Sequence, residues 1–177
     1  MSTGIEGWLV KMDLKKLDSF GGIKSKIAPR TTVGDVAHQM EYHGTVARNA
    51  FDRYLLEDDG LTAQYILSGS VLEFNYYVDA LRDLIMVIVA EKRGGVVESL
   101  LDCIKYYKRT RNLVTPAIET LDYLYTRNAL IHEYDNSAQL QDGYKTFMLN
   151  YAEGLFALCD DVRKCCLELD IMNICVK

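Results

Sequence analysis

The octapeptide RNALIHEY, residues 127–134, brings together an arginine, an amide, a histidine and a tyrosine. Histidine titrates near neutral pH, so His132 could move a proton to or from a ribose hydroxyl or a leaving oxygen. Arginine holds a permanent charge on a planar set of donors, so Arg127 could bind the oxygens of a phosphate. Asn128 could orient the histidine or donate to the same phosphate. The residue types of this octapeptide therefore suit the cleavage of a phosphodiester.

The spacing of these residues divides them between two faces of a helix. Each residue of a helix turns by about 100°, so residues four or seven apart share a face. Asn128 and His132, four apart, therefore align on one face, and Arg127 and Tyr134, seven apart, align on another. Arg127 and His132 diverge by roughly 140° on a regular helix. They can act on one phosphate if the helix bends or ends between them, or if two chains pool their groups across a twofold axis. The plain alternative is that arginine and histidine only cap the end of a helix.

The octapeptide resembles the signature of the HEPN superfamily, small helical-bundle proteins in which an arginine is followed after four residues by a histidine. A polar residue, often asparagine, follows the arginine there, as Asn128 does here. The ending His132-Glu133-Tyr134 is similar to that of HEPN toxins encoded beside minimal nucleotidyltransferase antitoxins, in which the tyrosine can receive AMP. The resemblance covers eight residues late in the chain.

This resemblance implies metal-independent RNA cleavage by a homodimer, without a cofactor, in a toxin–antitoxin or phage-defence system. Arg127 and His132 of both protomers would be the catalytic residues in one cleft, with Asn128 and Tyr134 in support. Some members of the superfamily bind nucleotides or partner nucleotidyltransferases without cleaving RNA. A non-catalytic binding module is therefore the alternative function that the resemblance leaves open.

A second segment, KYYKRTRN at residues 105–112, alternates cations with aromatic rings. Cations suit an RNA backbone and rings suit unstacked bases. Because the net charge is −5, RNA binding would need such a local basic patch. The predicted RNA-binding residues are Lys105, Tyr106, Lys108, Arg109 and Arg111. The alternative is a solvated helix end with buried tyrosines, since cations are favoured at a helix carboxyl terminus.

Hydrophobic periodicity predicts an all-α fold that positions both segments. The expected helices cover residues 33–56, residues 61–92, a stretch from about 96 to 111, a stretch opened by Thr115 as N-cap before Pro116, and a last stretch with a heptad seam. We expect an up-and-down bundle of four or five helices over residues 33–177, HEPN-like, with residues 1–32 as an accessory arm.

Two apolar stripes are expected to face the core. In the first helix the stripe is Val36, Met40, His43, Ala47, Phe51 and Tyr54. In the second helix the inward residues are Tyr65, Leu72, Tyr76, Leu84 and Ile88. His43 is therefore expected in the core or at an interface. Glu73, which stands among apolar residues, either is buried and orients Arg127 or lies on the helix surface.

Composition limits the class of protein. A hydrophobic share of 49% and a charged share of 25% in 177 residues are typical of one globular domain. The longest apolar run, LIMVIVA, is too short to span a membrane, and the first residues lack the layout of a signal peptide. A cytoplasmic location is therefore expected. The five cysteines follow no ligand or disulfide spacing, so buried thiols are expected and a metal site is not.

Overall fold

The computed structural model describes residues 31–176, apart from residues 96, 98 and 134–136, and only the backbone of residues 125–133 and 137–140. The chain divides into two compact units, Met1–Thr31 and Thr32–Lys177. The predicted accessory arm, residues 1–32, therefore falls almost entirely outside the described residues. The account below concerns the second unit.

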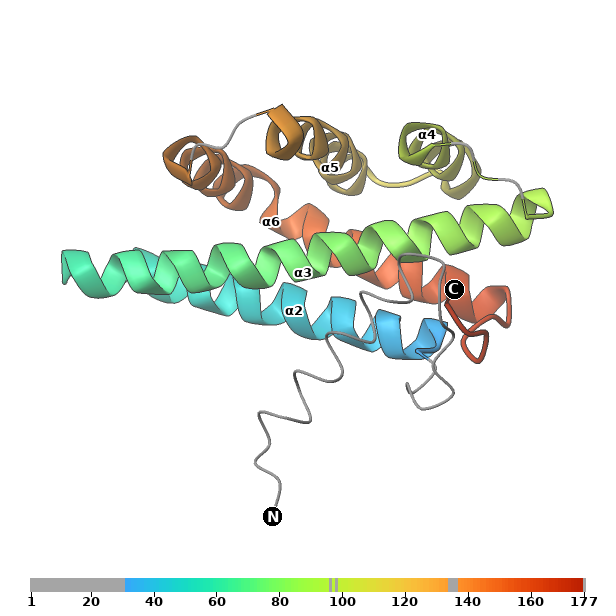
Figure 1. The fold of residues 1–177 in the computed structure, drawn as a ribbon, viewed down its shortest axis with the longest axis horizontal. Coiled ribbons are helices and arrows are strands. Elements are labelled where there is room, and N and C mark those ends of the chain that lie inside the picture. The colour runs from blue at the N-terminus through green and yellow to red at the C-terminus, as the bar shows by residue number, and fades with distance from the viewer. Residues whose placement is uncertain (1–30, 96, 98, 134–136, 177) are drawn as a thin grey trace, which may run out of the picture. The chain divides into compact units, whose positions relative to one another are not determined.

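The second unit is an all-α helical bundle, which confirms the predicted fold class. Its helices are α2 (Val33–Leu55), α3 (Gly60–Arg93), α4 (Leu100–Arg111), α5 (Thr115–Glu133) and α6 (Ser137–Glu168) (Figure 1). Within the described ranges, strand-like pairing is limited to one bridge between Thr32 and Cys175.

The helix boundaries follow from capping residues. Thr32 accepts a hydrogen bond from the backbone N–H of Asp35, whose carboxylate accepts one from the Thr32 N–H. This reciprocal capping box begins α2. Asp59 caps the start of α3, and Gly94, with φ 77°, adopts the left-handed conformation that ends it.

Two predicted helix starts differ from the structure. The third helix begins at Leu100 instead of near Val96, because the hydroxyl of Ser99 caps it. The fourth helix begins at Thr115, and the first backbone bond is accepted by the carbonyl of Val114. Thr115 is therefore the first helical residue and not the N-cap.

The helices pack as two pairs joined by α6. Figure 1 shows α2 and α3 side by side along the horizontal, with α4 and α5 grouped above α3 and seen nearly end-on. α6 packs against α2, α3 and α5. α4 packs against α3 and α5, and its Tyr107 and Arg111 side chains reach α6. The heptad seam predicted in the last helix is confirmed, because Tyr144, Met148, Leu155, Leu158, Val162 and Cys165 are buried.

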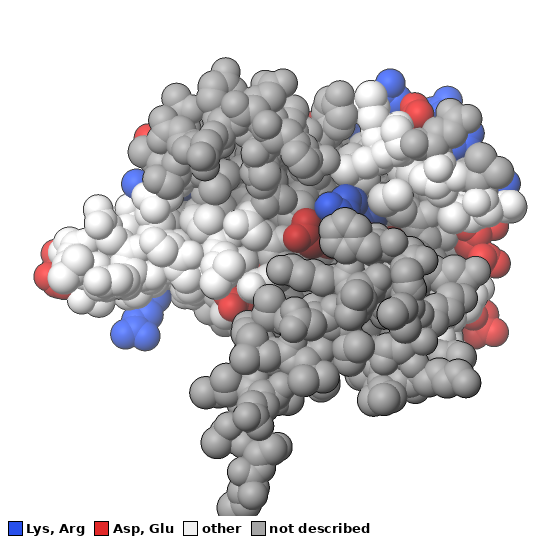
Figure 2. Space-filling model, in the orientation of Figure 1, with Lys and Arg blue, Asp and Glu red and all other residues white. Residues whose placement is uncertain are grey.

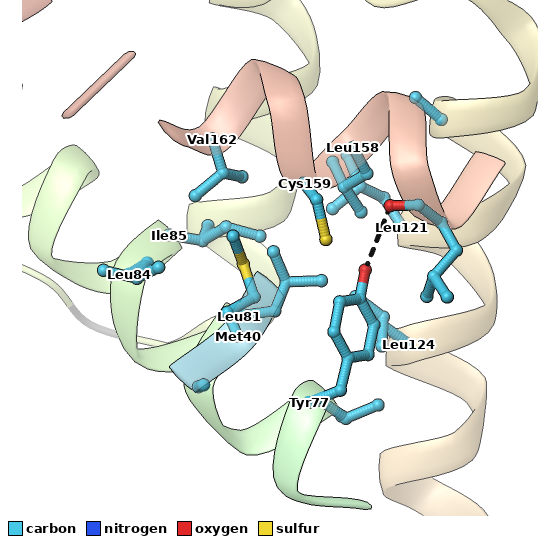
Figure 3. Packing of buried hydrophobic residues seen from close by; sticks show 14 of the residues in the cluster. Met40, Tyr77, Leu81, Leu84, Ile85, Leu121, Leu124, Leu158, Cys159 and Val162 are labelled. Carbon is cyan, nitrogen blue, oxygen red and sulfur yellow. Dashed lines mark hydrogen bonds between the residues drawn. The ribbon is translucent and has the colours of Figure 1, made fainter. Parts of the chain in front are cut away.

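The core is close-packed where α2, α3 and α6 meet. Tyr77 of α3 is fully buried, and its hydroxyl donates to the carbonyl of Leu155 of α6 at 3.4 Å (Figure 3). Gly44 of α2 lies against this ring: an added Cβ would be 2.9 Å from Tyr77 Cδ2. Buried Ser70 donates to the carbonyl of Ala47 at 2.6 Å. These contacts fix how α2 and α3 are aligned.

The stripe predicted in the first helix is largely confirmed. Val36, Met40, Ala47 and Phe51 are buried, and His43 and Tyr54 are partly buried.

The stripe predicted in the second helix is wrong in its first half. Leu84 and Ile88 are fully buried, but Tyr65, Leu72 and Tyr76 are at least half exposed. The physical reason is that α3 is apolar on more than one face, and in its first half only one side meets other described helices.

Candidate functional site

The octapeptide that suggested chemistry lies at the carboxyl end of α5. The helix continues without interruption through Arg127 and His132 to Glu133. The side chains of Arg127, Asn128 and His132, and the whole of Tyr134, lie outside the described residues. The backbone nevertheless answers one question. Because the helix does not end between positions 127 and 132, regular helical geometry puts these positions about 140° apart around the axis.

The first turns of α5 are held firmly against α6. Ala117, Leu121 and Leu124 are buried. Gly154 of α6 permits a very close approach, since an added Cβ would be 2.2 Å from the carbonyl oxygen of Pro116. This contact admits only glycine, because the obstructing atom belongs to the backbone.

An aromatic contact continues this packing toward the octapeptide. The ring of Tyr123 stacks on Phe147 of α6, with centroids 4.1 Å apart and planes at 25°. Phe74 of α3 lies 6.4 Å from the same tyrosine ring. The octapeptide therefore begins one turn beyond a rigid aromatic cluster, and its helix is well positioned by the core.

The basic segment lies on α4, beside the second half of α5. The ammonium of Lys108 lies 2.7 Å from the carboxylate of Asp122, and Ile104 and Leu124 line the same small cavity. Position 127 is three residues, or about 4.5 Å of helix rise, beyond Leu124. Lys105, next to Ile104, is exposed on this part of α4.

Arg111, the last cation of the basic segment, takes part in an internal ionic network. Its guanidinium lies 3.0 Å from Asp161 and 2.7 Å from Glu168 of α6, and its side chain is 13% exposed. Tyr107, fully buried, donates its hydroxyl to Asp161 at 2.5 Å. The hydrogen bond to Asp161 raises the pKa of Arg111, and burial raises that of Tyr107. This network fastens α4 to α6, and Arg111 would have to leave two carboxylates to bind RNA.

The other members of the predicted RNA-binding set differ in availability. Lys108 is paired with Asp122, and the ring of Tyr106 lies under the guanidinium of Arg93 at 5.2 Å. Lys105 and Arg109 are exposed and make no ion pair within the described ranges. Figure 2 shows cationic side chains gathered over the α4 end of the bundle. Of the four cations in the predicted RNA-binding set, Lys108 and Arg111 are already bound by carboxylates.

A polar pair that the sequence analysis did not predict joins α2 to α3. Nδ1 of His43 lies 2.6 Å from Oε2 of Glu73, and each side chain is about one-quarter exposed. The rings of Tyr42 and Tyr76 both contact the imidazole of His43, each with its centroid 5.2 Å from the imidazole centroid. No sequence signal could reveal this pair, because the two residues are on different helices and meet only through the alignment of α2 with α3.

The cysteines offer no reactive thiolate in the core. Cys103, Cys159, Cys165 and Cys166 are buried, as predicted, whereas Cys175 is exposed, contrary to the prediction. Burial raises the pKa of Cys159 and of Cys166 to about 12, so these thiols stay protonated at neutral pH. Over the ranges that the structure describes, no three side chains of histidine, cysteine, aspartate or glutamate are grouped to hold a metal ion.

Comparisons of the chain with protein-family models, with curated proteins and with solved structures found no match. Among the helices described, none has both the length and the apolar character of a membrane span.

Proposed function

We propose that this protein is a metal-independent endoribonuclease of HEPN type whose composite site uses Arg127 and His132 from two chains. The observation that carries the proposal is the octapeptide RNALIHEY, of which residues 127–133 lie on α5 without interruption. Its arginine and histidine positions diverge on a regular helix, so one helix does not aim both at one phosphate. A symmetric dimer resolves the divergence by supplying the second group from its partner.

Four polar residues of the octapeptide have roles in this proposal. His132 would remove the proton of a ribose 2′-hydroxyl, whose oxygen attacks the adjacent phosphorus, and a protonated imidazole would return a proton to the departing 5′-oxygen. Arg127 would stabilise the negative charge that develops on the phosphoryl oxygens. Asn128 would orient the imidazole or the phosphate. Tyr134 would be the position at which a nucleotidyltransferase-type antitoxin attaches AMP, and the setting would be a cytoplasmic toxin–antitoxin or phage-defence pair.

The basic segment would guide the RNA toward this cleft. Lys105 and Arg109 are both exposed and stand one turn apart on α4. Because each bound phosphate displaces a condensed counterion, removing either cation would weaken RNA binding and reduce its dependence on salt. Lys108 and Arg111 would contribute less, since carboxylates already neutralise them.

One observation favours the alternative function, a non-catalytic module that binds a nucleotide or partners a nucleotidyltransferase. The chain carries a net charge of −5, and only Lys105 and Arg109 of the basic segment lack a carboxylate partner within the described part. Two such cations make a weak RNA-binding surface. This function predicts a stable complex with a nucleotidyltransferase and no cleavage of RNA.

The deciding experiment is incubation of the purified protein with total RNA in the presence of a chelator. We expect cleavage by the wild-type protein and a loss of about 10²-fold to 10⁴-fold in His132→Ala, the range that general acid–base catalysis contributes. Arg127→Ala should lose comparable activity. Matched controls are His38→Ala and Arg53→Ala, which alter an exposed histidine and an exposed arginine of α2.

Circular dichroism should show the same helical content in all four variants. Cleavage that survives in both octapeptide variants would rule out the proposal. A wild-type protein without nuclease activity that co-purifies with a nucleotidyltransferase would establish the binding module instead.

A further inference from the structure

The first half of α3 carries an apolar stripe that faces solvent. Its residues are Leu61, Tyr65, Ser68, Leu72 and Tyr76, whose steps of four, three, four and four keep them on one helical face. The large members are 63%, 72%, 51% and 50% exposed, in chain order. Solvent-facing stripes of surface helices are normally polar, and no element among the described residues covers this one.

The charges around the stripe indicate what could cover it. Between residues 61 and 78 the only charged side chain is Glu73, and its carboxylate is bound to His43. Figure 2 shows the surface over this half of α3 almost free of cations and anions. Nucleic acids and membrane surfaces are bound through lysine and arginine, which the stripe does not offer. An apolar protein surface is the remaining class of partner.

The area of the surface is adequate for a stable protein contact. Through the partly buried His43, the stripe continues from Tyr76 onto Tyr42 of α2, which is 57% exposed. If each tyrosine side chain has an area of ~200 Å², then Tyr42, Tyr65 and Tyr76 expose about 360 Å². Each partner in a standard interface contributes ~800 Å². Three tyrosines thus supply nearly half of that area, and the leucines of the stripe add to it.

Small residues at the centre of the stripe permit a close approach. Ser68 and Gly69 are both exposed, and a Cβ added to Gly69 would meet nothing within 4 Å. A glycine inside a helix costs about 0.5–1 kcal/mol relative to alanine. No contact within the chain calls for a glycine here. A second helix that crosses at this point would use the space that Gly69 leaves.

We infer that the stripe is the contact surface for a second copy of this chain, with the two α3 helices antiparallel across a twofold axis near residue 70. The stripe is self-complementary about that point. Tyr65 would oppose Tyr76 of the second copy, and Ser68 would oppose Leu72, so that a large residue meets a small one at the centre. The inference deepens the proposed function and rests on it for its functional meaning, because the composite site needs a second chain.

The first test measures molar mass by light scattering after size exclusion. The wild-type protein is expected to be a dimer at micromolar concentration. Leu72→Glu places a charge at the centre of the stripe and should raise the dimer dissociation constant by about 30-fold or more, as for a central interface residue. Leu149→Glu is the matched control, since Leu149 is 65% exposed on α6 outside the stripe, and it should remain dimeric.

The second test is a cross-link that only the antiparallel arrangement allows. Ser68→Cys chains mixed with Leu72→Cys chains, both in a Cys175→Ser background that removes the exposed thiol, should form a covalent dimer on oxidation, and either variant alone should not. Leu149→Cys in the same background should not. A wild-type monomer would overturn the inference, whatever then covers the stripe. A dimer that Leu72→Glu leaves intact, or that the paired cysteines fail to link, would overturn it as well.

The RNA-cleavage assay separates this inference from the proposed function. A dimer that depends on Leu72 but cleaves no RNA would keep the interface and reject the nuclease. A monomeric Leu72→Glu variant with full cleavage would keep the interface and reject the two-chain site. Cleavage by a monomeric wild-type protein would reject both the interface and the two-chain site.

Discussion

Residues 61–76 and residues 80–90 belong to the same uninterrupted helix, α3, and both stretches are rich in apolar side chains. In the second stretch no residue is fully exposed, and Leu81, Leu84, Ile85 and Ile88 are completely buried. In the first stretch Tyr65 and Leu72 face solvent, although both are large side chains of the kinds that fill the core elsewhere in the bundle.

The difference between the two halves lies in their neighbours. α4 folds back along the second half, where Leu100 and Ile104 line a small cavity with Val78 and Ile85. Beside the first half, α2 and α6 cover the buried side and leave the stripe open. An apolar helical face is stabilised by contact, and the described helices supply that contact in only one half of α3. The other half is where we expect a second copy to bind.

Truncating one leucine in each half of α3 should give the largest difference in stability between the two halves. Leu84→Ala should lower the free energy of unfolding by about 2–5 kcal/mol, because Leu84 is completely buried and its truncation leaves a cavity in the core. Leu72→Ala should change that free energy by less than about 0.5 kcal/mol at concentrations where the protein is monomeric. Urea denaturation at low protein concentration measures both. Equal losses in the two variants would show that the stripe is buried in solution.

A pair of glycines gives a second, smaller contrast. Gly44→Ala should lower the free energy of unfolding by about 1–3 kcal/mol, since its methyl group would press on the ring of Tyr77, which cannot move within the core. The measurement is again urea denaturation, with a crystal structure or a near-ultraviolet spectrum to report the displaced ring. A stabilised Gly44→Ala variant would mean that α2 and α3 are packed less closely than described.

Gly69→Ala should give the smallest effect, and one of opposite sign. The added methyl group meets nothing within 4 Å, so the monomer should become more stable by about 0.5–1 kcal/mol through helix propensity. Dimerisation should weaken at the same time, because the small centre of the stripe is filled. Denaturation and light scattering on one sample test the two parts. A Gly69→Ala variant that dimerises more tightly would contradict the proposed crossing point.

Much of the fold could be predicted from the sequence because the signals are local. The periodicity of apolar residues predicted the five described helices. Thr32 and Asp59 cap the starts of α2 and α3, and Gly94 ends α3, as expected for these residue types. Two helices begin at other residues than predicted: α4 begins at Leu100, a few residues after the predicted start, and α5 begins at Thr115, one residue before it. Helix ends are hard to predict to the residue, because several neighbouring polar residues could act as the cap.

The candidate site could be predicted only in part. The octapeptide and the basic segment are contiguous in the sequence, so both could be found without a structure. The pairing of Arg111 with Asp161 and Glu168 could not, because those carboxylates are 50 and 57 residues away. For the same reason the contact between His43 and Glu73, which are 30 residues apart, gave no signal.

The sequence by itself determined the all-α class, the residues on each helical face and the divergence of positions 127 and 132, since all three follow from the 3.6-residue turn of the helix. Only the tertiary structure decided which apolar face of α3 is covered, which cations are paired with carboxylates, and that His43 pairs with Glu73. These outcomes depend on the alignment of helices against one another. That alignment is set by contacts such as Gly44 with Tyr77 and Gly154 with Pro116, which join residues far apart in the chain and leave no periodic trace in it.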